Sequence, residues 1–317
     1  MKYQVEEVAG RGRALVAVEP IARGEVVLEE QVLINASNLR PGGKTRAGAN
    51  SGEYDMEFLE RRVGLLCPED LALFLALNDP QPCGPPALRH QRIYCNNTFH
   101  DGLFLAAARM NHSCWPNVLL SSADGLRSEV VALRDIPAGE EITVSYLRTS
   151  HLETWEQRRT KLQDLWQFQC CCSLCSMPRE EARENDRARR DTSYTMDRVA
   201  GLFDSLWRAN SKVTMEVAAP LLRVFTHQAL EALEVLESGK LAGQADTALL
   251  LVLQQLAELV AFSCCGRFLE AGEVCREGRA EEFLGRAREV AGGLGAMFLC
   301  NCATIEREVK ELAMDFG

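Results

Sequence analysis

The sequence has no long run of lysine and arginine. Its 317 residues contain 35 Lys and Arg against 45 Asp and Glu, which gives a formal net charge of −10 at pH 7. Because phosphate binding needs clustered positive charge, this composition argues against nucleic acid as a direct partner. An acidic surface suits a basic peptide better, and we therefore expect a protein or peptide partner.

The sequence also has no apolar run long enough to span a bilayer. Its most apolar stretch, Ala248 to Phe262, contains Gln254, Gln255 and Glu258, whereas a spanning helix needs about 20 apolar residues. No hydrophobic signal region follows Met1. The 13 cysteines are therefore expected to be thiols or metal ligands rather than disulfides, in a reducing compartment, the cytoplasm and/or the nucleus.

The N-terminal half alternates short β-prone segments with turns and one helical segment. A loop is predicted at 40–52, where five residues are glycine or proline. Apolar residues at helical spacing predict one helix over 54–78, ended by the proline-rich stretch 79–86. A hairpin turn is expected at Asp124-Gly125. The predicted strands are 14–18, 26–34, 117–121, 129–133 and 141–146.

The C-terminal half has the pattern of helices. Residues 151–166 predict one helix, and the charged stretch 177–192 predicts either a linker or a solvated helix. From about 193 to the end, apolar stripes recur at helical spacing, without a repeat of fixed period. The expected fold class is therefore α+β in the N-terminal half, followed by an all-α C-terminal domain.

A cysteine-rich stretch, FQCCCSLC at 168–175, has the spacing of a metal site. Cys170, Cys172 and Cys175 form a C-x-C-x-x-C arrangement that can direct three thiolates at one point. Zinc takes four ligands in a tetrahedron, and Cys114 is the best fourth donor in the sequence. Cys171 is then expected to point away. The alternative is a set of buried thiols without a metal.

A second group of cysteines lies in the helical half and matches no zinc motif. Free cysteine behaves as a small buried hydrophobe, so these residues are expected to be core thiols. They are Cys264, Cys265, Cys275, Cys300 and Cys302.

The short polar stretch MNHSCWPN, residues 110–117, lies between apolar segments. It is either a turn whose polar groups satisfy one another in the core or a binding site. The stretches MNHSCWPN, PAGEEITVSYL at 137–147 and FQCCCSLC together resemble those of SET-domain protein lysine methyltransferases. Their order and spacing are similar to the SET and MYND (SMYD) branch, and VAGRGRALVAVEPIARGEVVLEE at 8–30 is similar to its first strands.

The resemblance covers residues 4–35 and 93–176 and implies a domain organisation. It implies a SET domain over 1–148 with β-sheets and a pseudoknot, interrupted by a helical or loop insertion at 36–92. A zinc-binding post-SET segment would follow at 149–178, and a helical, TPR-like domain at 179–317. The MYND zinc finger is not expected, because residues 36–92 contain only two cysteines, Cys67 and Cys83.

The resemblance also implies the cofactors and their residues. S-adenosylmethionine and one structural zinc ion are expected, with Cys114, Cys170, Cys172 and Cys175 as zinc ligands. Tyr146 would be the catalytic residue and would also border the cofactor. The other residues expected at the cofactor are Gly10, Arg11, Gly12, Asn97, Asn111, His112, Trp166 and Phe168.

The implied function is transfer of a methyl group from S-adenosylmethionine to a lysine of a histone or non-histone protein. The lysine must arrive deprotonated, and a tyrosine hydroxyl can orient it without acting as a strong base. Taken alone, Tyr146 is more typical of a core strand residue. A catalytically weak SET-like scaffold is the alternative function. Partners are expected to be a substrate protein or peptide, with the chain a monomer or homodimer.

Overall fold

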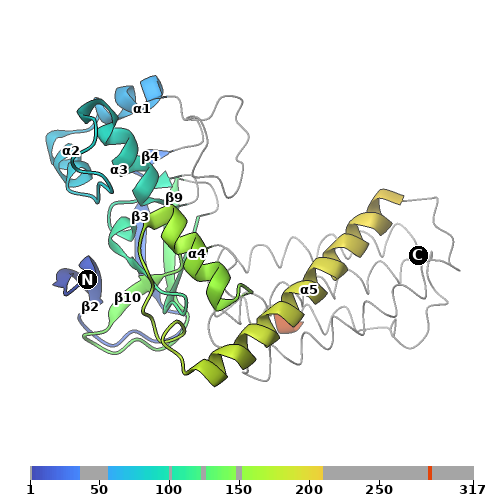
Figure 1. The fold of residues 1–317 in the computed structure, drawn as a ribbon. Helices are drawn as coiled ribbons and strands as arrows, with labels where there is room; N and C mark the ends of the chain where they lie inside the picture. The colour runs from blue at the N-terminus through green and yellow to red at the C-terminus, as the bar shows by residue number, and fades with distance from the viewer. Residues whose placement is uncertain are drawn as a thin grey trace, which may run out of the picture. The chain divides into compact units, whose positions relative to one another are not determined.

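The structure is a computed structural model that describes residues 2–35, 56–99, 102–122, 126–147, 152–209 and 285–287. The chain divides into two compact units (Figure 1). One contains residues 1–148 and 159–170, and the other contains residues 149–158 and 171–317. The second cysteine group and nearly all of the predicted C-terminal helices beyond 209 lie outside the described residues.

The first sheet of the first unit brings the beginning of the chain beside the MNHSCWPN stretch. Strands β1 and β2 are antiparallel and are joined by a tight turn in which Gly10 and Gly12 have φ angles of 73° and 69°. β10 pairs antiparallel with β2 and parallel with β7, where Thr143 lies opposite Asn111 and Val144 opposite His112. The strand order is β1 (Tyr3–Val8), β2 (Gly12–Ala17), β10 (Glu141–Val144) and β7 (Asn111–His112).

Two smaller sheets complete the β structure of this unit. The strands predicted at 26–34, 117–121 and 129–133 are confirmed within a few residues, and the strand predicted at 14–18 corresponds to β2. The predicted turn at 124–125 lies outside the described residues. The antiparallel orders are β3 (Val26–Gln31), β9 (Arg127–Ala132) and β8 (Val118–Ser121), and β4 (Ile34–Asn35), β6 (Gly102–Leu103) and β5 (Thr98–Phe99).

The single helix predicted over 54–78 is wrong, because the structure has two helices there. The first is α1 (Met56–Val63), and α2 (Pro68–Leu75) begins again at Cys67, whose sulfur accepts the Asp70 backbone N–H at 3.4 Å. Proline lacks the N–H needed inside a helix but is favoured in its first turn, so Pro68 starts a helix rather than continuing one. The next helices along the chain are η1 (Pro86–Leu88), α3 (Arg89–Asn97) and η2 (Ala107–Arg109).

Two apolar clusters form the core of the first unit. One lies between the first two sheets and contains Leu15, Phe104, Met110 and Ile142, each at most 1% exposed. Tyr146 packs against this cluster. The other cluster lies among α1, α2, α3 and the third sheet. The core therefore surrounds the segment that leads into MNHSCWPN, which fixes the position of that segment before any ligand is considered.

Beyond the SET-like strands, two helices follow one another along the chain. The helix predicted at 151–166 is confirmed as α4 (Trp155–Trp166), and the charged stretch begins a long helix, α5 (Arg179–Ala209). The solvated-helix alternative was therefore the better one, although Asn185 and Arg189 are buried and the Arg189 Nε donates to the Asn185 Oδ1 at 2.6 Å. Within the described part of the chain, no helix has the length and apolarity needed to cross a membrane.

Candidate active site

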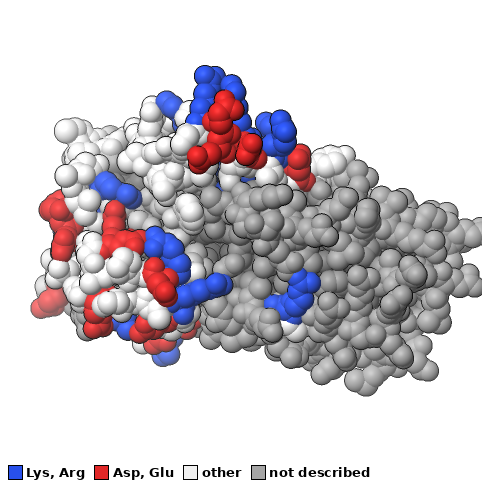
Figure 2. Space-filling model, turned by 90° about the horizontal axis from the view of Figure 1, so that it is seen from below, with Lys and Arg blue, Asp and Glu red and all other residues white. Residues whose placement is uncertain are grey.

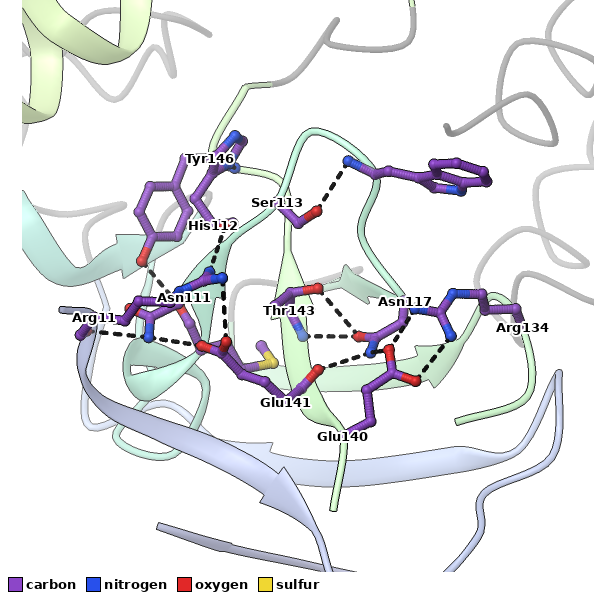
Figure 3. Close-up of polar contacts among 12 residues, drawn as sticks. Arg11, Asn111, His112, Ser113, Asn117, Arg134, Glu140, Glu141, Thr143 and Tyr146 are labelled. Atoms are coloured by element: carbon purple, nitrogen blue, oxygen red, sulfur yellow. Dashed lines mark hydrogen bonds and ion pairs between the residues drawn. The ribbon is translucent and has the colours of Figure 1, made fainter. Parts of the chain in front are cut away.

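Tyr146 lies two residues beyond β10, and both its backbone and its hydroxyl are fixed by MNHSCWPN. Its hydroxyl donates a hydrogen bond to the Met110 carbonyl at 2.9 Å, and its backbone N–H donates to the His112 Nδ1 at 3.0 Å (Figure 3). Burial raises the pKa of the Tyr146 hydroxyl to about 12; nearby Glu141 adds to this rise and Arg11 opposes it. The hydroxyl therefore stays protonated at physiological pH.

Four aromatic rings surround Tyr146. The ring centroids of His112 and Trp166 lie 5.3 Å and 5.4 Å from that of Tyr146, and those of Phe99 and Phe168 lie at 6.2 Å and 6.4 Å. Three of these residues, His112, Trp166 and Phe168, were expected from the sequence at the cofactor, and Phe99 was not named there. Phe99 is contributed by the short strand β5, two residues after Asn97, whose expected place at the cofactor was a usable signal. The four rings thus pack around the ring of Tyr146, and this packing contributes to the burial that raises the pKa of its hydroxyl.

A left-handed residue at the end of α4 separates two of these rings in the chain. Gln167 has a φ of 59°, and its N–H donates to the Gln163 carbonyl at 3.1 Å. A residue in this conformation ends a helix and reverses the chain direction. Trp166 and Phe168, on either side of it, both reach Tyr146. The hydrophobic pattern of α4 carries no signal for this reversal, because the conformation depends on a single residue.

The Asn111 amide is held within a polar network rather than pointing at open space. Its Nδ2 donates to the Glu141 Oε1 at 2.8 Å and to the Arg11 carbonyl at 3.2 Å (Figure 3). Arg11 in turn donates from one guanidinium nitrogen to the His112 carbonyl at 2.8 Å, and the other lies 3.2 Å from Glu141. The network joins the glycine turn to β7 and β10. These contacts hold the Arg11 side chain in place, so it is not a freely solvated surface residue.

Asn117, the last residue of MNHSCWPN, fastens the same strand from the other side. Its side chain is fully buried and donates to the Glu140 Oε1 at 2.9 Å and the Glu141 carbonyl at 2.8 Å. Its Oδ1 accepts the Thr143 backbone N–H at 2.7 Å. Glu140 is also paired with Arg134 (Figure 3). Asn117 was not predicted to have a role, although an asparagine directly before an apolar strand was a usable signal.

The glycine turn leaves the backbone accessible where a ligand is expected. A left-handed φ strains any residue with a Cβ atom, which explains glycine at positions 10 and 12. No heavy atom lies within 4 Å of a Cβ built on either residue. The turn therefore has open space beside it, as close approach of a ligand to the backbone requires.

Asn97 lies in a different environment from the other predicted cofactor residues. Its buried amide donates to the Ile93 carbonyl of its own helix at 2.7 Å and to the Asn78 carbonyl at 2.8 Å. These bonds fix the end of α3, two residues before Phe99. The amide hydrogens of Asn97 are thus engaged by backbone oxygens, and its place at the cofactor stays a prediction.

Four cysteine sulfur atoms gather within 4.8 Å of one another. They are those of Cys114, Cys170, Cys172 and Cys175, the set expected from the sequence. A tetrahedral zinc with sulfurs at about 2.3 Å separates those sulfurs by about 3.8 Å, so the observed spacing fits the ion.

Two hydrogen bonds hold the turn that carries the last two of these cysteines. The Ser176 N–H donates to the Cys172 carbonyl at 2.9 Å, and the Trp155 Nε1 donates to the Cys175 carbonyl at 3.2 Å. Cys171 is exposed and does not belong to the group of four.

The fold and the site together agree with one family model. The model described as the SET domain matches residues 12–147. Residues 12–147, which are less than half of the chain, are thus similar to the SET domain. The matched region contains the strand pairs β2–β10 and β7–β10 as well as Tyr146. It also contains Asn111 and Glu141, and Arg11 directly precedes it.

The matches to curated relatives cover only part of this chain and only part of each relative. "Histone-lysine N-methyltransferase SET5" of Meyerozyma guilliermondii is 38% identical over 133 residues, which are 39% of this chain and 26% of that protein. The protein named set5 in Schizosaccharomyces pombe is 40% identical over 97 residues, 29% of each chain. "N-lysine methyltransferase SMYD2" of Gallus gallus is 38% identical over 88 residues, 28% of this chain and 19% of that protein. The chain thus spans less than a third of the length of these relatives, and its resemblance to SET-domain and SMYD proteins is confirmed.

Proposed function

We propose that this protein is an S-adenosylmethionine-dependent protein-lysine N-methyltransferase. The observation that carries the proposal is Tyr146, whose hydroxyl is fixed at 2.9 Å from the Met110 carbonyl inside a ring of aromatic side chains in a SET domain. The names of the fungal relatives specify histone lysines, and that of the chicken relative specifies lysine without naming a protein. The substrate is accordingly proposed to be a protein or peptide lysine, on a histone or another protein.

The residues around the glycine turn fit the proposed cofactor. S-adenosylmethionine supplies a methyl group on a cationic sulfur and has an amino-acid end and an adenine. Gly10 and Gly12 offer an accessible backbone, and the Asn111 Oδ1 accepts no hydrogen bond from the described residues. In this proposal the Asn111 oxygen binds the ammonium of the amino-acid end. The rings of Trp166 and Phe168 border the adenine or the lysine channel.

Tyr146 is proposed to orient the lysine amine rather than to remove its proton. With a pKa near 12 the hydroxyl is not ionised at neutral pH, so it cannot serve as a general base there. Its hydrogen is directed to the Met110 carbonyl. The lone pairs of the same oxygen therefore remain to accept a hydrogen bond from the amine and to hold it in line with the methyl group. Apolar surroundings favour the deprotonated amine, which is the nucleophile.

The four cysteines are proposed to hold one structural zinc ion. The ligands would be Cys114, Cys170, Cys172 and Cys175, whose sulfur atoms already lie within 4.8 Å of one another. Bound zinc cross-links the chain at these four points. Because Phe168 precedes Cys170 by two residues and contacts Tyr146, the site would fix this aromatic neighbour of the catalytic tyrosine.

The finer architecture is part of the same proposal. The parallel pairing of β7 with β10 is consistent with a pseudoknot in which the GEEITVSY segment crosses MNHSCWPN. We further propose a post-SET segment over 149–178 and an all-α domain over 179–317. A cytoplasmic or nuclear location and a monomer or homodimer are proposed from the sequence alone.

On the face that Figure 2 shows, acidic and basic side chains of the described residues are interspersed.

Cofactor binding separates an enzyme from a scaffold. Isothermal titration calorimetry of the zinc-loaded full chain with S-adenosylmethionine is expected to give saturable binding at one site per chain. Asn111→Leu is the diagnostic variant, because it removes the proposed acceptor. Ser122→Ala, at a position directly after β8 whose hydroxyl donates to the Arg127 carbonyl at 2.6 Å, is the control. Absence of binding by the native sequence would support the scaffold instead.

A further inference from the structure

The imidazole of His112 bonds to two groups on opposite sides of its ring. The Nδ1 lies 3.0 Å from the Tyr146 backbone nitrogen, and the Nε2 lies 3.1 Å from the Cys114 Sγ. The ring is buried, with only 3% of the residue exposed. It also lies beside the rings of Tyr146 and Phe168, at centroid distances of 5.3 Å and 5.9 Å. The His112 side chain therefore contacts Tyr146, Phe168 and Cys114, one of the four clustered cysteines.

The bond to Tyr146 determines which ring nitrogen carries the hydrogen. A backbone amide nitrogen can only donate, so the Nδ1 of His112 must accept and holds no hydrogen in this arrangement. An imidazole keeps at least one N–H, which must then be on the Nε2. This N–H is directed at the Cys114 sulfur, which can only be the acceptor. The same reasoning excludes His112 as a metal ligand through the Nε2.

We propose that His112 is a positioning residue that donates its Nε2–H to the metal-bound sulfur of Cys114 and thereby links the zinc site to the backbone of Tyr146. The proposal rests on the zinc site proposed above. It assigns the histidine side chain a role distinct from cofactor binding. Outer-shell hydrogen bonds orient metal ligands, and their loss typically lowers metal affinity about 10- to 100-fold.

The surrounding backbone makes this link rigid. His112 is in β7, opposite Val144 of β10, and the Ser113 N–H donates to the Val144 carbonyl at 3.0 Å. The Ser113 Oγ accepts the Trp115 N–H at 3.0 Å, which closes the turn after Cys114. The imidazole thus spans two chain segments that backbone hydrogen bonds already hold in register. A displacement of the Cys114 sulfur would be transmitted through the ring to the Tyr146 amide.

Two substitutions of His112 separate its two hydrogen bonds. In His112→Asn the side-chain amide reaches about as far as the Nδ1, so it can keep the Tyr146 bond but cannot reach the sulfur. In His112→Gln the amide nitrogen reaches about as far as the Nε2, so it can replace the donor to Cys114. Ser113→Ala is the matched control, because it alters the same turn without removing a donor to sulfur. All are measured in the full-length, zinc-loaded protein.

The first measurement is the rate at which zinc is released to a colorimetric chelator. We expect His112→Asn to release zinc about 10-fold faster than the native protein, and His112→Gln and Ser113→Ala to stay within about 3-fold of it. Equal acceleration in the Asn and Gln variants would show that the histidine acts only through packing, and would overturn the proposal. Unchanged release in the Asn variant would overturn it as well.

The second measurement detects the bond itself and does not depend on methyl transfer. Zinc is replaced by an NMR-active cadmium isotope, and the His112 Nε2–H is examined for scalar coupling to the metal through the sulfur. The proposal predicts this coupling in the native protein and in Ser113→Ala. A native protein that holds the metal without the coupling would defeat the inference and leave the zinc site intact. A native protein that holds no metal would contradict the zinc site, and the inference with it.

Discussion

Removal of one oxygen atom from Tyr146 tests the catalytic role that the structure gives it. In Tyr146→Phe the ring stays among Phe99, His112, Trp166 and Phe168, while the hydrogen bond to the Met110 carbonyl is lost. A lost hydrogen bond of this kind lowers the free energy of unfolding by about 1 kcal/mol. The variant should therefore fold, with a small decrease in melting temperature.

The expected effect on the rate is much larger than the effect on stability. The hydrogen bond from the amine to the hydroxyl oxygen is made mainly in the transition state, and loss of a comparably oriented hydrogen bond costs about 2–4 kcal/mol, or roughly 30- to 1000-fold in rate. Removal of an interaction made in the transition state lowers the rate and leaves cofactor binding nearly unchanged. Single-turnover methylation measures the first quantity, and calorimetric titration with S-adenosylmethionine measures the second.

A second tyrosine of the same core provides the control. Tyr3 packs against the same apolar cluster as Tyr146, and burial raises the pKa of its hydroxyl too. Tyr3 pairs with Ala17, at the end of β2 remote from Gly12. Tyr3→Phe should therefore keep the native rate. Near-native turnover in Tyr146→Phe would show that this tyrosine is only a core residue. A large loss of cofactor affinity would show that its hydroxyl supports the pocket instead.

Three further predictions concern the turn, the pH dependence and the metal. Gly12→Ala should weaken S-adenosylmethionine binding about 10-fold or more. Gly139 also has a left-handed φ and open space beside it, so Gly139→Ala should cause similar backbone strain and leave cofactor binding unchanged. Because the folded-state pKa of Tyr146 is raised from 10.0 to about 12, its neutral form stabilises the fold below pH 10. The free energy of unfolding should fall by about 3 kcal/mol as the pH rises through 12. Denaturant titrations at several pH values measure it, and an equally large fall in Tyr146→Phe would refute this prediction. Cys172→Ser should lose its zinc by elemental analysis and Cys171→Ser should keep it; full zinc in the first variant would rule out the ligand set.

Local patterns in the sequence were sufficient for much of the fold. Strands β2, β3, β8, β9 and β10 contain short apolar segments with valine or isoleucine, and they occur within a few residues of their predicted positions. The helix α3 was missed because it contains few apolar residues and buries only Ile93, Tyr94 and Asn97. The break between α1 and α2 was missed because the apolar spacing continues across it. Pro68, the first residue of α2, was the signal in the sequence for a new helix start.

The candidate site was predictable in its motifs and less so in its contacts. Sequence spacing could suggest that Cys114 joins the later cysteines, and the four sulfur atoms do lie together. The contact of Phe99 with Tyr146 could not be predicted, because it depends on how β5 pairs with β6. The two bonds of His112 depend on the parallel register of β7 and β10. No local pattern specifies that register, since it joins residues about thirty positions apart.

The most direct test of the proposed function is mass spectrometry of peptides after incubation with the enzyme. The full-length, zinc-loaded protein is mixed with S-adenosylmethionine carrying a deuterated methyl group and with a library of lysine-containing peptides that includes histone tails. The account predicts a deuterated methyl group on the side-chain nitrogen of particular lysines, strongly reduced with Tyr146→Phe and unchanged with Tyr3→Phe. Methylation of no lysine by a protein that binds the cofactor, or equal methylation by Tyr146→Phe, would contradict it.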